Sequence, residues 1–202
     1  MVRMSSIDKK TCSLPAGLQQ ILIDIALLSI HHGLANHTPF PIGREGLAPE
    51  LAIPRATFVT IHLDEQLRGC IGSLQAVRPL AEDIAHNAFA AAFLDRRFAP
   101  LSAREAGRVR LHLSLLTSAI PVEFRSEADL LAKIVPFEDG LILEDGNRRG
   151  TFLPSVWASL PNPEKFLQHL KLKAGLPPDH WSTTLRVWRY HTESIHQLAP
   201  TH

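Results

Sequence analysis

Cys70 and Arg68 are the two side chains in this sequence whose types and spacing best suit covalent chemistry. They lie two residues apart in a segment that reads as a β-strand, so their side chains would share one face, with their roots about 6–7 Å apart. A nearby guanidinium favours the thiolate over the thiol, and the thiolate attacks electrophiles and binds soft metals. The spacing therefore predicts a reactive thiol at Cys70, with Arg68 as its charge partner.

Cys70 also has a purely structural interpretation, which we favour. Free cysteine is among the most buried residue types, and here it would pack as a small hydrophobe beside Ile71. Gly69 and Gly72 leave the backbone uncovered on either side, so a ligand or another segment of the chain can approach closely. We therefore take Gly69 and Gly72 as candidate substrate-binding positions, without deciding between ligand and chain.

Arg97 and Thr151 are two further candidates for substrate binding. Arg97 follows an alanine-rich helix, where Asp95, Arg96 and Arg97 would form either a capping and salt-bridge cluster that complements the helix dipole or an anion-binding corner; we favour the cluster. The Thr151 hydroxyl would bind substrate or cap the helix that follows Pro154, and we favour the cap.

Histidines give no metal site that the sequence can identify. His62 and His112 would each suit a Cys-His pair with Cys70, but neither spacing is diagnostic. The chain holds eleven histidines and two cysteines without an H-x-x-x-H or a C-x-x-C motif. We therefore assign no metal ligand and no cofactor.

Composition places the chain among ordinary globular proteins. Its 202 residues allow one domain or two small subdomains, and 45% of them are hydrophobic. The net charge is +1 and the sequence has no run of basic residues, so it does not predict a positively charged surface that binds nucleic acid. The apolar run from Leu18 to Ile30 is short for a membrane span and contains Asp24. We predict no span and no secretory signal, and hence a cytoplasmic protein with reduced thiols.

The hydrophobic pattern predicts an α+β fold with a largely antiparallel sheet. The clearest strand, residues 108–116, alternates apolar and polar side chains, as a half-buried strand does. Helices and strands alternate too irregularly for repeated βαβ units. The expected helices are 18–33, 80–94, 126–134, 155–160 and 163–174, and the expected strands are 56–63, 67–72, 108–116, 140–145, 148–153 and 184–190.

The hexapeptide from Leu67 to Gly72, Leu-Arg-Gly-Cys-Ile-Gly, resembles the signature of the AMMECR family, named for a chromosomal region associated with Alport syndrome. The resemblance covers roughly residues 14–195, so a chance match of one motif does not explain it. It implies a single domain of two unequal, interleaved subdomains with a groove between them, and tails at 1–13 and 196–202. Further segments that resemble the family, in the same order, are 78–84, 87–88, 95–98, 139–143, 149–154 and 170–177.

The turn before the hexapeptide departs from the family pattern. Relatives often carry Asn-Gly there, whereas this chain has Asp64 and Glu65. Glutamate resists the positive φ of a two-residue type I′ turn, so we expect a longer or bulged turn. A slip of one residue reverses the faces of a strand, so the direction of Cys70 stays open.

The resemblance implies a role but no catalytic residue. Bacterial and archaeal relatives are linked by gene neighbourhood to a Memo-like protein, which resembles metal-dependent ring-cleaving dioxygenases, and to a radical SAM protein. The chain is thus similar to the A component of this AmmeMemoRadiSam system, with an accessory or adaptor role. The alternative is a small-molecule enzyme or redox protein with Cys70 and Arg68 in the groove. We place the adaptor slightly ahead because no complete set of nucleophile, base and oxyanion donors is identifiable.

Overall fold

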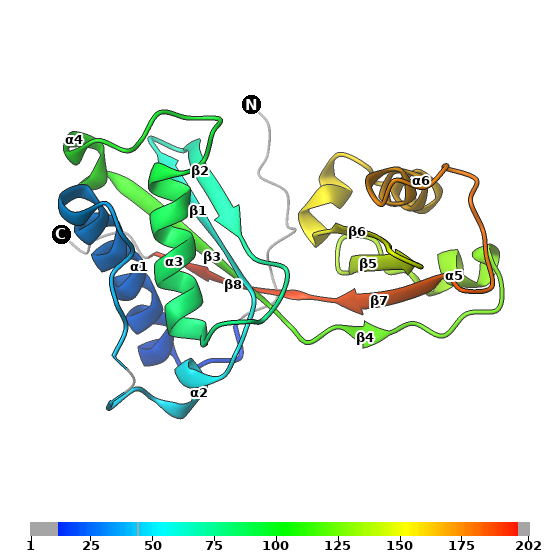
Figure 1. The fold of residues 1–202 in the computed structure, drawn as a ribbon, viewed down its shortest axis with the longest axis horizontal. Helices are drawn as coiled ribbons and strands as arrows, with labels where there is room; N and C mark the ends of the chain where they lie inside the picture. Colours follow the sequence, from blue (N-terminus) through cyan, green and yellow to red (C-terminus); the bar gives the residue numbers. More distant parts are fainter. Residues whose placement is uncertain (1–11, 44, 198–202) are drawn as a thin grey trace. The chain divides into compact units, whose positions relative to one another are not determined.

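The computed structural model describes residues 12–43 and 45–197 (Figure 1). The described residues form two compact units, which we call the larger unit (residues 12–116 and 193–197) and the smaller unit (residues 117–192). The smaller unit is therefore one continuous segment, whereas the larger unit is built from two.

The larger unit is a four-stranded sheet with helices on one side. The strand order is β2-β1-β3-β8, and β1 pairs antiparallel with both β2 and β3. Helix α3 packs on β1 and β2, and α1 packs on α3, as Figure 1 shows. The strands are β1 Thr57–Leu63, β2 Gln66–Gly72, β3 Val109–Leu116 and β8 Thr192–His196, and the helices are α1 Ala16–Asn36, α2 Pro49–Ala52, α3 Leu80–Phe93 and α4 Ala103–Ala106.

The alternation predicted for β3 is confirmed. Val109, Leu111, Leu113 and Leu115 are buried, while the residues between them are partly or fully exposed. We call the side of this sheet turned away from α3 the open face. Register and contacts across the strands place six partly or fully exposed side chains there: Thr60, His62, Cys70, Arg110, His112 and His196.

Helix α1 serves as a core helix of the larger unit. It extends over 21 residues, further than the apolar run suggests, and among the described helices it alone is long and apolar enough to cross a membrane by length and composition. Its residues Leu22 and Ile30 are fully buried in the core. Ser13 does not cap it; the Ser13 hydroxyl donates instead to Glu193 at 3.0 Å.

The smaller unit is a second four-stranded sheet, in the order β4-β7-β5-β6, with helices packed against it. Trp157 stacks on Phe166 in its core, with ring centroids 3.7 Å apart. Ser126 caps α5 by accepting from the Asp129 amide. The elements are β4 Ile120–Pro121, α5 Glu127–Lys133, β5 Gly140–Asp145, β6 Arg148–Phe152, the 3₁₀ helix η1 Pro154–Ala158, α6 Pro163–Lys173 and β7 Arg186–Tyr190.

The two units together confirm the α+β class, since both combine helices with antiparallel strand pairs. Of the two alternatives expected before the hexapeptide, a longer turn or a bulged one, the prediction of a longer turn is wrong. Asp64 and Glu65 form a two-residue connection, both with positive φ, at 50° and 64°. The expected bulge is present, but it lies further along: Arg68 is the extra residue, between the pairs His62–Leu67 and Ile61–Gly69.

Candidate functional site

Cys70 lies on β2, which is an edge strand, and its side chain belongs to the open face. It pairs with Thr60 of β1, and its Sγ is 3.3 Å from the Thr60 Oγ1. The neighbouring residue Gly69 faces α3 instead. Since successive side chains on a strand alternate, Cys70 points away from the helices. The residue as a whole is partly exposed.

The segment after α3 binds both polar main-chain groups of Cys70, its N–H and its carbonyl. The Cys70 N–H donates to Asp95 Oδ2 at 2.9 Å, and the Cys70 carbonyl accepts from Arg97 Nη2 at 3.2 Å. Asp95 and Arg97 are themselves paired through two hydrogen bonds, of 2.9 and 2.7 Å, and Arg96 is not part of this pair. These side chains occupy polar groups that an edge strand otherwise leaves unpaired.

The Asp95–Arg97 pair is ionic. The hydrogen bond from Arg97 holds the pKa of the Asp95 carboxyl well below its usual range, although burial opposes this. The same bond raises the pKa of Arg97, and the neighbouring Cys70 raises it further. The Arg97 side chain is 56% exposed, so the charged group beside Cys70 remains open to solvent.

Arg68 is directed to a different partner from the one we expected. Its Nε donates to Glu105 Oε1 at 2.8 Å, and its guanidinium lies 5.9 Å from the centre of the Phe98 ring. The side chain is only 14% exposed. The bulge at Arg68 interrupts the alternation that would place it beside Cys70. The arginine that is hydrogen-bonded to Cys70 is Arg97, through the Cys70 carbonyl.

Glu105 makes the larger unit sensitive to acid. The hydrogen bond from Arg68, with further bonds from Ser102, lowers the pKa of Glu105 from 4.5 to about 2. A carboxyl with a depressed pKa in the folded state stabilises the fold above its unfolded pKa, and this contribution is lost as the pH falls through the folded pKa. The stabilisation by Glu105 is therefore complete above pH 4.5 and disappears towards pH 2.

We expect Glu105→Gln to reduce the loss of stability on acidification. The measurement is the free energy of unfolding in urea at pH 6 and pH 3, followed by far-ultraviolet circular dichroism. The difference between the two pH values should be smaller in the variant than in the wild type. Glu50→Gln on α2, where the carboxyl is exposed, is the control and should keep the wild-type difference. Equal differences for Glu105→Gln and the wild type would contradict the assignment.

Gly69 and Gly72 are packing positions. A Cβ on Gly69 would lie 2.1 Å from the carbonyl oxygen of Ala91 on α3, and a Cβ on Gly72 would lie 2.2 Å from the Phe58 ring. The sequence left open whether a ligand or another segment of the chain lies against these glycines, and the structure shows another segment of the chain. The space beside each glycine is filled by the protein and is not available to a substrate.

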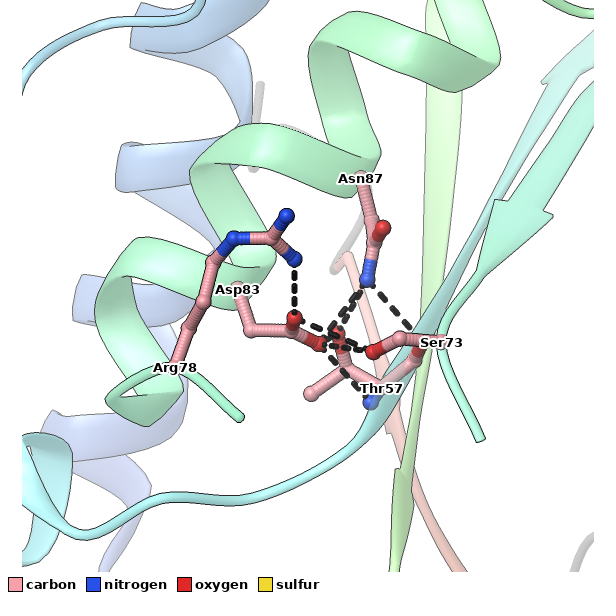
Figure 2. Close-up of polar contacts among 5 residues, drawn as sticks. All are labelled: Thr57, Ser73, Arg78, Asp83 and Asn87. Carbon is pink, nitrogen blue, oxygen red and sulfur yellow. Dashed lines mark hydrogen bonds and ion pairs between the residues drawn. The ribbon is translucent and has the colours of Figure 1, made fainter. Parts of the chain in front are cut away.

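A buried polar cluster, which the sequence analysis missed, fastens α3 to the sheet (Figure 2). The fully buried Asp83 carboxylate accepts from the Thr57 amide and hydroxyl at 3.0 and 2.8 Å, and from the Ser73 hydroxyl at 2.8 Å. Asn87 donates to it at 2.9 Å and Arg78 at 3.3 Å. The available signal was Asp83 and Asn87 themselves, four residues apart on the buried face of an alanine-rich helix.

Helix α3 therefore secures β2 at two points. Asp83, in its first turn, reaches Ser73 just after the end of β2, and Asp95, just after its last turn, reaches Cys70. The buried Asp83 carboxylate is saturated with donors, which suits fastening and not reaction. Cys70, which is partly exposed, and the Arg97 side chain are the parts of this arrangement that stay accessible.

Thr151 lies in the smaller unit, in a buried position. Its hydroxyl is 3.2 Å from the Tyr190 hydroxyl, which donates to the Phe152 carbonyl at 3.1 Å. Burial raises the pKa of Tyr190 to about 12, so this hydroxyl stays protonated at neutral pH. The cap that we favoured for Thr151 is wrong, because η1 begins after Leu153 without a side-chain cap.

Two histidines of the open face, His112 and His196, lie side by side. His112 stacks on His196, with ring centroids 4.3 Å apart and ring planes 5° from parallel. Across residues 12–43 and 45–197, no group of three or more His, Cys, Asp or Glu side chains is placed to hold a metal ion. Cys12 and Cys70 are both free thiols.

Comparison with known proteins places this fold and sequence in one family. The family model described as AMMECR1 matches residues 23–195. A protein of Thermofilum pendens is 36% identical over 89% of this chain and 90% of its own, and Protein MJ0810 of Methanocaldococcus jannaschii is 36% identical over 72% and 75%. The crystal structure of the uncharacterized protein PH0010 from Pyrococcus horikoshii is similar, with a TM-score of 0.76 and 30% identity over 90% of this chain and 92% of that one. The chain thus belongs to the AMMECR1 family.

Proposed function

We propose that this protein is a cytoplasmic accessory protein, an adaptor that works with a Memo-like protein and a radical SAM protein. The partners come from the family resemblance. The observation that carries the adaptor role is how the hexapeptide is used: its glycines pack on α3 and Phe58, its arginine binds Glu105, and the main chain of Cys70 is held by Asp95 and Arg97. These residues build a stable edge strand and leave the open face to contact a partner.

The open face has the character of a polar docking surface. Thr60, Cys70 and His112 lie in register across three strands, and His196 extends the row to β8 through its stack on His112. Arg110 and His196 are exposed. A surface of partly exposed polar and aromatic side chains on a rigid sheet resembles the polar rim of a transient interface more than an enclosed substrate site.

A second candidate function is thiol chemistry at Cys70. It is favoured by the partial exposure of Cys70 and by the Arg97 guanidinium bound to the Cys70 carbonyl. The hydrogen-bond partner of the sulfur is the Thr60 hydroxyl, which is not a base at neutral pH. A nucleophilic thiol is activated by a neighbouring base, and the Thr60 hydroxyl does not act as one, so we rank this candidate second.

The adaptor proposal predicts that charge reversal on the open face weakens partner capture. The purified Memo-like and radical SAM proteins of the same organism are passed over the immobilised protein, and the affinity for each is measured. We expect the double variant Arg110→Glu/His196→Glu to bind about tenfold more weakly. A partner that pairs with the Arg110 guanidinium carries negative charge at this place, and the two new carboxylates would repel it. Arg104→Glu, at an exposed position on α4, is the control and should bind as the wild type does.

Cys70→Ser separates the two candidates. Serine keeps the main-chain bonds of Cys70, so the adaptor proposal expects unchanged capture and unchanged activity of the reconstituted three-protein system. If capture survives but that activity is lost, thiol chemistry is the function instead. Wild-type capture by the folded Arg110→Glu/His196→Glu variant would overturn docking through the open face.

A further inference from the structure

We propose that the smaller unit contains a binding site for a small anion that carries a planar ring. A cavity of about 440 Å³ lies between the segment 121–125 and the segment 181–188. This volume falls in the range of small-molecule sites, about 300–1,000 Å³. Three aromatic side chains and two arginines line it: Phe124, Trp181, Trp188, Arg125 and Arg186.

The aromatic side of the cavity is a supported stacking surface. Trp181 and Phe124 pack against each other with ring centroids 5.5 Å apart. The Lys171 ammonium lies 5.8 Å from the centre of the Trp181 ring and is paired with Glu127 at 3.0 Å. Lys171 is fully buried, so this cation belongs to the core. Trp181 is nevertheless 38% exposed, which leaves ring surface for a planar ligand.

The charge of the lining selects the sign of the ligand. Aromatic rings next to Glu123 alone would suit a cation, as in the cages that bind quaternary ammonium groups. Arg125 and Arg186 are both exposed and outnumber this single carboxylate. The cross-strand neighbour of Arg186, Glu144, has its carboxylate bridged to Arg149 at 3.0 Å. A guanidinium binds carboxylate or phosphate through two parallel hydrogen bonds, so an anion is favoured.

One wall of the cavity is fixed in place before any ligand arrives. Asp145, at the end of β5, accepts from the hydroxyls of Ser182 and Thr184 at 2.7 and 2.6 Å and lies 2.5 Å from the His180 imidazole. These hydrogen bonds, that of Thr184 first, lower the pKa of Asp145 to about 2, so it is a charged acceptor at neutral pH. The segment that carries Trp181 is thereby anchored to the sheet, and a pre-formed wall reduces the entropy lost on binding.

The test is a titration with ligands that carry both features or only one of them. AMP and 4-hydroxybenzoate combine a planar ring with an anionic group, whereas adenosine offers only rings and inorganic phosphate only charge. Binding is measured by calorimetry and by tryptophan fluorescence, since Trp181 and Trp188 line the cavity. We expect at least one ring-bearing anion to bind with a dissociation constant below about 1 mM, and about tenfold more tightly than adenosine or phosphate.

Variants then locate the site. Arg186→Gln and Trp181→Ala should each weaken binding about tenfold, while Arg104→Gln in the larger unit should leave it unchanged. Arg186 is exposed, so its replacement tests the site even if Trp181→Ala disturbs folding. The proposal is overturned if neither ring-bearing anion binds, if Arg186→Gln binds as well as the wild type, or if tetramethylammonium binds more tightly than both AMP and 4-hydroxybenzoate. These outcomes are independent of partner capture by the open face.

Discussion

Replacing Asp83 with alanine is expected to lower the free energy of unfolding of the larger unit by about 3–5 kcal/mol, the range for breaking a buried charged pair. The carboxylate is fully buried and accepts hydrogen bonds from Thr57, Ser73, Asn87 and Arg78. Its removal leaves these donors without their acceptor and detaches α3 from β1 and from the end of β2. The measurement is urea unfolding followed by far-ultraviolet circular dichroism.

Two companion variants make the Asp83 result specific. Asp83→Asn keeps the volume but turns an amide donor towards groups that are themselves donors, so it should also be destabilising. Asp24→Ala removes an exposed carboxylate on α1 that accepts a hydrogen bond from Gln20 in the same helix, and it should cost less than about 1 kcal/mol. If Asp83→Ala cost no more than Asp24→Ala, the cluster would not be what fastens α3.

Gly69→Ala is expected to destabilise the larger unit by about 3 kcal/mol or more, at the upper end for overpacking. The added Cβ would lie 2.1 Å from the Ala91 carbonyl oxygen, which is a main-chain atom within α3. A flexible side chain can rotate away from such a contact, but a helix backbone cannot. Either the helix or β2 must shift, and that shift would disturb the bonds between Asp95 and Cys70.

The matched control for this variant is Gly107→Ala. Gly107 has an ordinary φ of −75°, and nothing lies within 4 Å of the Cβ that alanine would add. Its replacement should change the free energy of unfolding by no more than about 0.5 kcal/mol. Comparing two glycines of one unit separates close packing from the general loss of backbone freedom. A loss at Gly69 as small as that at Gly107 would show that α3 and β2 are not in tight contact.

Local patterns in the sequence predicted most of the elements. The strand at 109–116 follows its alternation, α3 begins directly after Pro79, and α5 is capped by Ser126. Each of these depends on neighbours within a few residues, which sequence patterns report directly. The same is true of the hairpin at 140–152, whose turn contains Gly146 with positive φ.

Features that depend on distant residues were missed. Strand β8 buries only Ile195 and is otherwise polar, so nothing in 192–196 predicts a strand until β3 is beside it. Ser13 bonds to Glu193, which is 180 residues away, and does not cap α1. Arg68 was assigned to Cys70 because strict alternation was assumed; the bulge in β2 and the distant Glu105 redirect it.

The position of the smaller unit within the chain has a consequence for synthesis. The chain leaves the larger unit at Leu116 and re-enters it at Glu193. Strands β3 and β8 are neighbours in one sheet, but the ribosome synthesises the whole smaller unit between them. Until β8 emerges from the ribosome, β3 has a vacant edge, including the Leu111 main chain that later bonds to Gln197. A nascent chain that stalls before Thr192 would therefore expose an unpaired strand edge that can pair with another chain. The helices α1 to α4 of the larger unit are already synthesised at that point.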